Sequence, residues 1–264
     1  KRRKKEEQLN SKDFPANKKY AIPLSITGAS NYSLIPSQRS AILLLNRSIL
    51  SSVAKVSGGE GIRIKPVGMH TKAEWTIQMS AIYSSLTRSN LTTAYLSNGT
   101  GGEFYTRISS TAGIQVKNGR DGDDTWTQIP LQAGKWLHIT YVHKDKKTTV
   151  YVNGKVQKVF ENSAITFGEN SMIVVGNSGY RNDYLREIRL WDKALTESEI
   201  NDYLYLPMDP ATPHLISYLP LSKEMETKDL KAPAGTENVT TKARIEYVEN
   251  VKFPADELVI VNQE

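Results

Sequence analysis

The clearest hydrophobic pattern in the chain is a strict alternation of side chains between Gly134 and Lys155. A period of two predicts β-strands, because successive residues of a strand point to opposite faces of a sheet. Charged residues at 144–147 interrupt the pattern, and Asn153-Gly154 supplies the positive φ angles of a tight type I′ turn. The pattern therefore predicts two consecutive β-hairpins.

Short alternating segments of the same kind fill most of the chain from residue 51 to residue 192. Glycine pairs such as Gly58-Gly59 separate several of them, which is typical of strands joined by turns. The segments lie at 51–57, 62–67, 74–85, 92–98, 103–110, 113–118, 125–130, 171–177 and 186–192. Many short strands at even spacing predict an all-β fold, a sandwich or jelly roll of two antiparallel sheets.

The first part of the chain differs from this pattern. Residues 1–12 are polar and charged, and two apolar segments at 20–26 and 40–46 predict a pair of strands. Two strands cannot bury a face by themselves, so the pair belongs to a larger module or packs on the strands after residue 48. We therefore expect a tether with a partial N-terminal β-module over 1–48, and a jelly roll with its closing strands over 49–264.

One short helix is predicted at residues 195–204. Thr196 is placed to act as the N-cap, and Glu199 completes a capping box three residues later. Leu195 and Ile200 occupy the positions of a hydrophobic staple, which supports the same helix start. Two further apolar segments are expected to close the fold as strands, at 214–221 and 256–262.

Composition and charge narrow the function classes. The chain has 264 residues, a hydrophobic content of 39% and a net charge of +6. The first five residues, all Lys or Arg, supply five of those charges, so the remaining chain is nearly neutral and a poor match to a nucleic-acid backbone. The absence of cysteine excludes disulfides, thiolate nucleophiles and cysteine-ligated zinc within these residues.

The motifs over residues 134–200 resemble the second half of a laminin-G-like, concanavalin A-like jelly-roll domain. A Gly-x-Trp strand, a Tyr-Val-Asn-Gly hairpin, an Arg-x-Trp strand and an Ala-Leu-Thr-x-x-Glu-Ile helix occur here in the family's order. The resemblance implies that fold, and it implies glycan binding or adhesion as the usual role.

Two further segments resemble parts of Bacteroides surface lipoproteins. Residues 14–46 are similar to the end of an N-terminal β-module of unassigned function, and residues 215–232 are similar to a returning strand of those lipoproteins. The resemblance implies an exported protein on the outer-membrane surface or outside the cell, anchored by a lipid on an upstream cysteine. Its expected partners are a glycan or polysaccharide, and other surface proteins.

The carboxylates of a glycanase are missing from the sequence pattern. Glycanase relatives carry Glu-x-Asp-x-x-Glu, which places two carboxylates about 5 Å apart for retaining hydrolysis. Glu187 comes nearest, but Arg189 stands where a carboxylate is needed, and Asp192 falls on the opposite face of the strand. We therefore expect an ion-pairing role for Glu187 and a protein that is not an enzyme. A glycoside hydrolase or lyase with non-contiguous carboxylates and a structural spacer domain are the alternatives.

An acidic turn is the one candidate metal site. Asp121, Asp123 and Asp124 lie within four residues and offer the hard oxygen ligands that Ca²⁺ prefers. The family resemblance adds weight, because calcium sites occur on the jelly-roll rim in this family. A plain acidic hairpin turn is the alternative, since Asn-Gly and Asp-Gly pairs also mark turns.

Two predicted loops carry the mixture of aromatic and polar residues that sugar binding needs. Flat rings stack on the C–H faces of pyranoses, and nearby polar groups bond the hydroxyls. Trp126 supplies a ring beside the acidic turn, whereas Trp136 and Trp191 lie in mid-strand and are expected in the core. The second loop, 177–184, offers Tyr180, Arg181, Asn182, Asp183 and Tyr184.

Overall fold

A computed structural model shows the protein as two compact units, Lys1–Ile49 and Leu50–Glu264. The division lies next to the boundary expected after residue 48. The structure describes residues 19–28, 40–46, 48–59, 61–67, 73–87, 89–95, 104–117, 122–161, 165–167, 171–176 and 180–262, and every structural statement below refers to these.

The first unit contains an antiparallel hairpin of two strands, β1 (Lys19–Ser25) and β2 (Ser40–Asn46). Both strands were predicted, and the structure confirms them. Leu24 and Ile42 are 49% and 69% exposed, so the hairpin leaves apolar side chains uncovered. That it belongs to a larger β-module stays a prediction.

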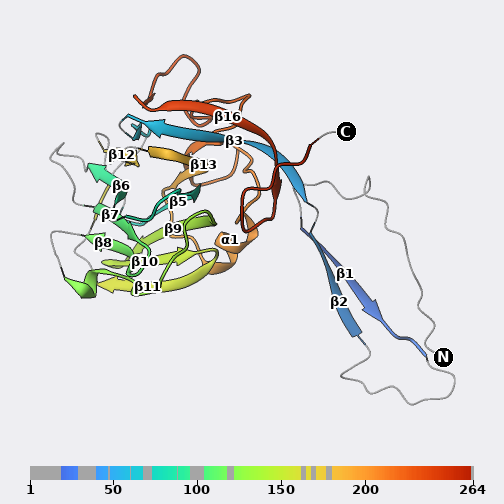
Figure 1. The fold of residues 1–264 in the computed structure, drawn as a ribbon. Coiled ribbons are helices and arrows are strands. Elements are labelled where there is room, and N and C mark those ends of the chain that lie inside the picture. The colour runs from blue at the N-terminus through green and yellow to red at the C-terminus, as the bar shows by residue number, and fades with distance from the viewer. Residues whose placement is uncertain are drawn as a thin grey trace. The chain divides into compact units, whose positions relative to one another are not determined.

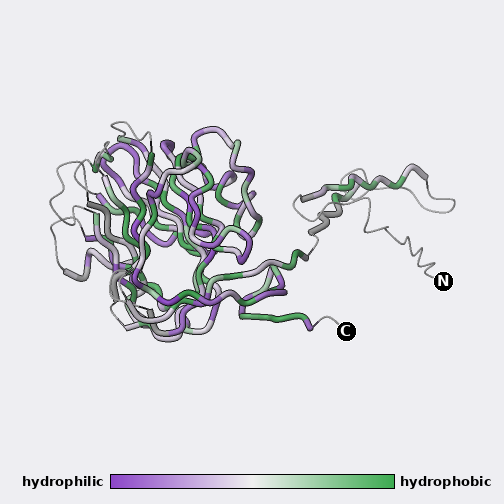
Figure 2. Tube along the Cα trace, turned by 90° about the horizontal axis from the view of Figure 1, so that it is seen from above, coloured by the Kyte–Doolittle hydropathy of each residue, from purple (hydrophilic) through white to green (hydrophobic). Residues whose placement is uncertain are grey.

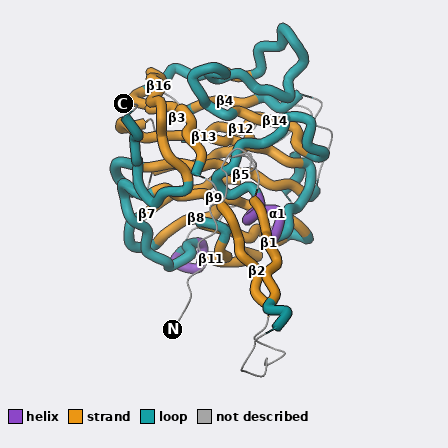
Figure 3. The backbone as a smooth tube through the Cα atoms, turned by 90° about the vertical axis from the view of Figure 1, so that its right-hand side faces the viewer, coloured by secondary structure: helices purple, strands orange, loops and turns teal. Residues whose placement is uncertain are grey.

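The second unit is a sandwich of two antiparallel sheets (Figures 1 and 3). The first sheet has the order β11-β10-β9-β5-β13-β3-β16, with β14 also paired to β13, and the second has the order β15-β4-β12-β6-β7-β8. The first sheet is built from β3 (Ile49–Gly58), β5 (Trp75–Ile82), β9 (Trp136–Lys144), β10 (Lys147–Val152), β11 (Lys155–Glu161), β13 (Tyr180–Trp191), β14 (Leu215–Leu219) and β16 (Arg244–Phe253). The second is built from β4 (Ile62–Ile64), β6 (Ser89–Tyr95), β7 (Phe104–Ser109), β8 (Gly113–Lys117), β12 (Met172–Val175) and β15 (Val239–Thr240).

The main core is the apolar layer between the two sheets. Trp75 is fully buried there, its ring lies 4.9 Å from those of Phe104 and Phe167, and its Nε1 donates to the carbonyl of Ile165 at 2.9 Å. Figure 2 shows hydrophobic (green) and hydrophilic (purple) positions following each other closely along the chain of this unit. The predicted sandwich is therefore confirmed.

The structure also contains the helix start and the hairpin turn that short sequence motifs predicted. Helix α1 (Glu197–Asp202) starts at Thr196, whose hydroxyl accepts from the Glu199 N–H at 3.3 Å while the Glu199 carboxylate accepts from the Thr196 N–H at 2.9 Å. Asn153 and Gly154 have φ angles of 51° and 74°, as the hairpin turn requires. The predicted capping box and turn are confirmed.

No helix in the described part of the chain has both the length and the apolar character that a transmembrane segment needs.

Two strand predictions were wrong, and two strands, β15 and β16, were missed. Residues 125–130 form no strand: Thr125 ends a short 3₁₀ helix (Asp123–Thr125), and Trp126 makes one isolated bridge to Gln115. Residues 256–262 make only isolated bridges, and the strand beside them is β16. Charged and half-exposed residues alternate along β16, because it lies at the edge of the sheet, and this weakens its hydrophobic signal.

Candidate functional site

Strand β13 departs from regular alternation at Glu187. Arg186 pairs with Ser80 of β5 and Arg189 pairs with Gln78, so one extra residue lies between the two pairs. Glu187 itself has a φ angle of 55°, which is unusual for a residue other than glycine. Such a bulge redirects side chains, and here it brings both arginines and Glu187 together.

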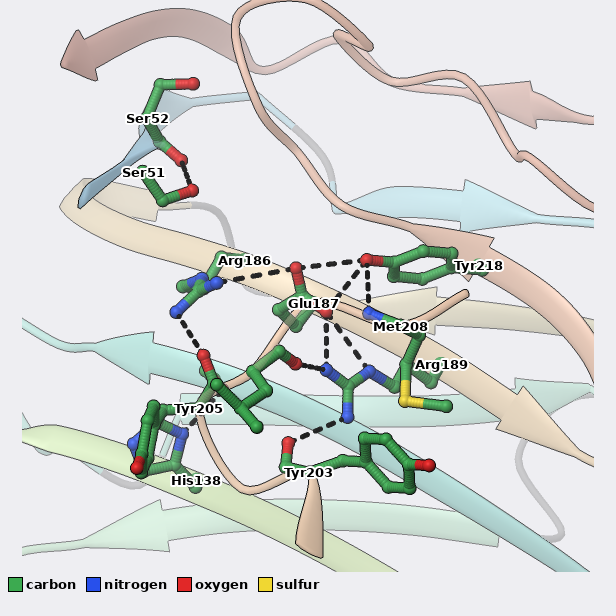
Figure 4. Close-up of polar contacts among 12 residues, drawn as sticks. Ser51, Ser52, His138, Arg186, Glu187, Arg189, Tyr203, Tyr205, Met208 and Tyr218 are labelled. Carbon is green, nitrogen blue, oxygen red and sulfur yellow. Dashed lines mark hydrogen bonds and ion pairs between the residues drawn. The ribbon is translucent and has the colours of Figure 1, made fainter. Parts of the chain in front are cut away.

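These three residues form a buried cluster of charges with Tyr218 of β14 (Figure 4). Glu187 is 4% exposed, and its Oε2 accepts from Arg189 Nε at 3.2 Å and from the Tyr218 hydroxyl at 3.0 Å. Its Oε1 accepts from Arg186 Nη2 at 3.5 Å. The ion-pairing role expected for Glu187 is confirmed, and the carboxylate is stabilised by two guanidinium groups.

The two arginines also hold the segment after helix α1 against the sheet. Arg186 Nη1 donates to the carbonyl of Tyr205 at 3.0 Å, and Arg189 Nη1 donates to the carbonyl of Tyr203 at 3.1 Å (Figure 4). Backbone carbonyls that would otherwise lose their hydrogen bonds on burial are satisfied in this way. The polar outer face of the sheet is therefore covered by the protein's own chain.

The segment after α1 that covers this face of the sheet also covers His138 of β9. Its Nδ1 is 2.7 Å from the hydroxyl of Ser80, and its ring stacks beside Trp136. Burial, and after it the positive charges of Arg186 and Arg189, lowers the pKa of His138 to about 3. The imidazole is therefore neutral in the folded protein, and His138 is a packed structural residue.

We expect this histidine to make stability fall in acid. Because its folded pKa is about 3 and its unfolded pKa is about 6.5, the unfolded state binds a proton that the folded state excludes as the pH falls below 6.5. The free energy of unfolding should decrease by about 2 kcal/mol between pH 7 and pH 5 through this residue. Urea unfolding at both pH values, compared with a His138→Gln variant, measures it. Equal losses in both proteins would contradict the prediction.

A pocket of about 380 Å³ lies over the buried charge cluster. We call it the Glu187 pocket, because the Glu187 carboxylate forms part of its wall. Strands β3, β13, β14 and β16 and the loops after α1 and β14 contribute to it. Its polar lining comes from Ser51, Ser52, Glu187, Tyr218, Ser222, Glu224, Glu249 and Asn250.

The carboxylates at the rim of this pocket are already paired or hydrogen-bonded. A bond from its own backbone N–H and one from the Ser222 side chain lower the pKa of Glu224. Glu249 accepts from the Lys223 ammonium at 2.6 Å. Glu224 is therefore a hydrogen-bond acceptor at neutral pH and not a proton donor. The Glu249 carboxylate is paired with the Lys223 ammonium.

Two residues that line the pocket, and one beside it, have positive φ angles. Glu187, Leu221 and Asn250 have φ angles of 55°, 54° and 57°, and Glu187 and Asn250 line the pocket directly. Residues other than glycine held at positive φ cost free energy, and they tend to collect at functional sites. The other strained residues include Asp145 and Asn153, which sit in hairpin turns that require this conformation. At Glu187 the positive φ angle belongs to the β-bulge of β13 described above.

The ring of Trp126, which was predicted to stack on a sugar, is buried. Its side chain is 4% exposed, and its backbone carbonyl accepts from Lys158 Nζ at 2.6 Å. A ring that is this deeply buried has no face to offer a sugar. Trp136 and Trp191, at 2% and 3% exposed, are core residues as expected.

The second predicted loop is largely strand. Tyr180 to Tyr184 open β13 and pair with β3, with a register shift between Arg181 and Asp183. Asp183 is 6% exposed, and its Oδ1 accepts from the Ser84 N–H at 2.8 Å, so it has a structural partner instead of a free carboxylate. Asn182 is exposed and Tyr184 is half-buried, and a ligand-binding role for these two stays a prediction. The side chains of Tyr180 and Arg181, and residues 177–179, lie outside the described residues.

The calcium prediction falls mostly outside the described part of the chain. Asp121 and the side chain of Asp123 are not described, and Asp124 is exposed. Within the described ranges no group of three acidic, histidine or cysteine side chains could hold a metal ion. Calcium binding by this turn stays a prediction.

Sequence patterns could not have assembled the Glu187 pocket. Ser52, Glu224 and Glu249 come from segments far apart in the chain, and none of them belongs to a recognisable motif. Only Glu187 stands out in the sequence, and it does so as a lone carboxylate. The fold alone brings the carboxylates together.

The comparison with protein families agrees with this fold. The model of the concanavalin A-like lectin/glucanases superfamily matches residues 57–201, more than half of the chain. The chain belongs to this superfamily. This match confirms the resemblance of residues 134–200 to a laminin-G-like, concanavalin A-like domain. No protein among the curated sequences matches the chain.

Several solved structures are similar to this chain at low identity. A protein of Bacteroides ovatus that is proposed to bind carbohydrate matches with a TM-score of 0.59 and 18% identity, over 93% of this chain and 72% of its own. A SAP-like pentraxin of Limulus polyphemus matches with 0.49 and 14%, over 76% and 94%. Trypanosoma rangeli sialidase matches with 0.45 and 16%, over 57% and 27%. The first likeness shows the fold alone, and the other two are weaker.

Proposed function

We propose that this concanavalin A-like protein binds carbohydrate without cleaving it, and that the Glu187 pocket is the binding site. The observation that carries the proposal is a pocket of about 380 Å³ that combines several hydrogen-bond acceptors with apolar side chains. Pockets of this size and mixture are typical of small-molecule sites. The Bacteroides ovatus protein with the same fold, which is itself proposed to bind carbohydrate, lends support.

The lining suits the two kinds of surface that a sugar presents. Glu224 and Glu249 offer carboxylate oxygens that can accept from hydroxyl groups, and such charge-assisted bonds are stronger than neutral ones. Met208, Met225 and Leu50 line the same pocket and offer apolar contact to C–H groups. A flexible thioether adapts to an irregular ligand surface.

The state of the carboxylates favours binding over catalysis. Glycoside hydrolysis needs a carboxyl group that holds a proton near neutral pH, which requires a raised pKa. Glu187 is occupied by arginines and Tyr218, the pKa of Glu224 is lowered, and Glu249 is paired with Lys223. Glu187 and Glu249 therefore already have cationic partners, and Glu224 already accepts hydrogen bonds.

A glycoside hydrolase is the second candidate, because one observation favours it. Glu187, Glu224 and Glu249 come from three different segments and line one pocket, so the non-contiguous carboxylates expected for the alternative do occur together. A reducing-sugar assay on any glycan that binds separates the two functions. Release of product would contradict binding without cleavage.

Export and anchoring belong to the same proposal. We propose an exported protein on the outer-membrane surface, attached through a lipid anchor upstream of this chain. The resemblance of residues 14–46 and 215–232 to segments of surface lipoproteins supports this location. Extraction of the full protein with detergent but not with high salt, together with its accessibility to protease on intact cells, tests it.

Glu224→Gln tests the pocket directly. The substitution keeps the size of the side chain but removes its charge, so affinity for a glycan identified on an array should fall about tenfold or more by calorimetry. Glu161→Gln is the matched control, because Glu161 is also an exposed carboxylate near a lysine, but lies on β11 at the other end of the sheet. Equal affinities of the two variants would contradict the proposed site.

A further inference from the structure

A second pocket adjoins the Glu187 pocket. It has a volume of about 440 Å³, and it is lined by the loop from Glu224 to Asp229 and by the segment from Thr236 to Val239. We call it the Asn238 pocket. Glu224 and Met225 line both pockets, so the two hollows share one wall.

The shared wall is an ordered turn. The N–H groups of Met225 and Glu226 donate to the carbonyl of Ser222 at 3.2 and 2.7 Å, and the N–H of Lys228 donates to the carbonyl of Met225 at 3.0 Å. Met225 is 39% exposed at the top of this turn. A ligand that extends from one pocket into the other would therefore cross a fixed backbone turn with an apolar side chain on it.

Asp229 forms hydrogen bonds with a residue that lines each of the two pockets. It is 3% exposed, and its Oδ1 accepts from the backbone N–H of Tyr218, which lines the Glu187 pocket, at 2.9 Å. Its Oδ2 accepts from the side-chain amide of Asn238, which lines the other pocket, at 2.8 Å. The two pockets therefore hold a fixed spacing, which is the condition for one ligand to occupy both.

We propose that the two pockets are neighbouring subsites for one uncharged oligosaccharide, which crosses the 222–228 turn between them. This inference rests on the proposed function of the Glu187 pocket and extends it to the size and charge of the ligand. A chain of sugars that fills both pockets contacts more of the protein than a disaccharide held in one of them.

The charges around the two pockets select the class of sugar. Lys228 is the only basic residue among the described residues that line them. Sialic acids, uronic acids and sulfated sugars would place an anion among the carboxylates of the lining. Arg186 and Arg189 compensate Glu187, and Lys223 pairs with Glu249. Glu224, Glu226 and Glu237 remain to repel such an anion. The acidic lining residues are Glu187, Glu224, Glu226, Asp229, Glu237 and Glu249.

Calorimetric titration with oligosaccharides of increasing length tests the two subsites. The probes are the disaccharides and hexasaccharides of glucose, mannose, xylose and N-acetylglucosamine, with oligogalacturonides as the charged counterpart. The series that binds should gain on the order of tenfold in affinity from disaccharide to hexasaccharide. The oligogalacturonides should bind more weakly than every neutral hexasaccharide that binds.

Variants assign that gain to the second pocket. Glu237→Ala should lower hexasaccharide affinity far more than disaccharide affinity, whereas Glu224→Gln should lower both, because Glu224 lines both pockets. Glu161→Ala, on the distant edge strand, should change neither. Melting temperatures of the three variants close to that of the parent exclude unfolding as the cause.

The outcomes distinguish the two proposals. A disaccharide that binds as tightly as its hexasaccharide, or a Glu237→Ala variant that affects both equally, overturns the two subsites and leaves binding in the Glu187 pocket intact. Tighter binding of the oligogalacturonides overturns the selection of uncharged sugars. If none of these sugars binds to the full chain, both the proposed function and this inference are wrong.

Discussion

Glu187→Ala is expected to lower the free energy of unfolding by about 3–5 kcal/mol, because it leaves buried guanidinium groups without their counter-charge. Arg186 and Arg189 are 1% and 2% exposed, so water cannot replace the lost carboxylate. Thermal unfolding should show a fall in Tm on the order of 10 °C for a chain of this size. The segment after α1 should loosen as well, since the same arginines bind its carbonyls.

The matched control is Glu161→Ala, which removes an exposed carboxylate that lies 2.9 Å from the Lys147 ammonium. Exposed ion pairs contribute at most about 1 kcal/mol, so this variant should unfold close to the parent temperature. A Glu187→Gln variant keeps one acceptor oxygen and should lie between the two. If Glu187→Ala melts no lower than the control, the buried cluster does not stabilise the fold in the way its geometry implies.

Much of the sandwich can be predicted from local signals in the sequence. The alternation from Trp136 onward, the Asn153-Gly154 turn and the Thr196 capping box each specify structure within a few residues. Such signals are reliable because strand period, turn conformation and helix capping act over short distances. All three appear in the structure as expected, and they lie within the motifs that resemble the superfamily.

The candidate site could not be found in the same way. A regular strand places Glu187 and Arg186 on opposite faces, so the sequence pattern offers no reason to group them. The bulge overrides that pattern, and it lies where the second neighbour of β13, besides β5, changes from β3 (up to Leu185) to β14 (from Ile188). Strand β16, which supplies Glu249, was missed because an edge strand keeps only half of its side chains from water.

The loop predicted to offer the ring of Trp126 to a sugar shows a related limit of sequence analysis. Trp126 comes after a run of acidic and glycine residues that is typical of an exposed turn, yet the ring is buried. The short 3₁₀ helix just before it turns the chain inward, and the isolated bridge to Gln115 fixes the backbone there. Residue type alone does not reveal whether a loop aromatic faces water or the core.

Asp229→Ala should give the second large loss of stability, about 3 kcal/mol or more. The Asp229 carboxylate is 3% exposed and accepts four hydrogen bonds, from Ser217 Oγ at 2.7 Å, from Asn238 Nδ2 at 2.8 Å, and from the backbone N–H groups of Tyr218 and Lys231 at 2.9 and 3.0 Å. Each buried donor left without an acceptor costs about 1–3 kcal/mol. Urea unfolding of the variant and the parent measures the difference.

Asp209→Ala is the comparison for this prediction, because Asp209 is an exposed carboxylate that accepts from the backbone N–H of Ala211 at 2.8 Å. It should cost about 1 kcal/mol or less. Asp229→Asn keeps one acceptor oxygen but puts an N–H₂ group where the second oxygen accepts, so it should fall between the two alanine variants. Equal losses for Asp229→Ala and Asp209→Ala would mean that the loop after β14 is not held by this carboxylate, and the fixed spacing of the two pockets would lose its physical basis.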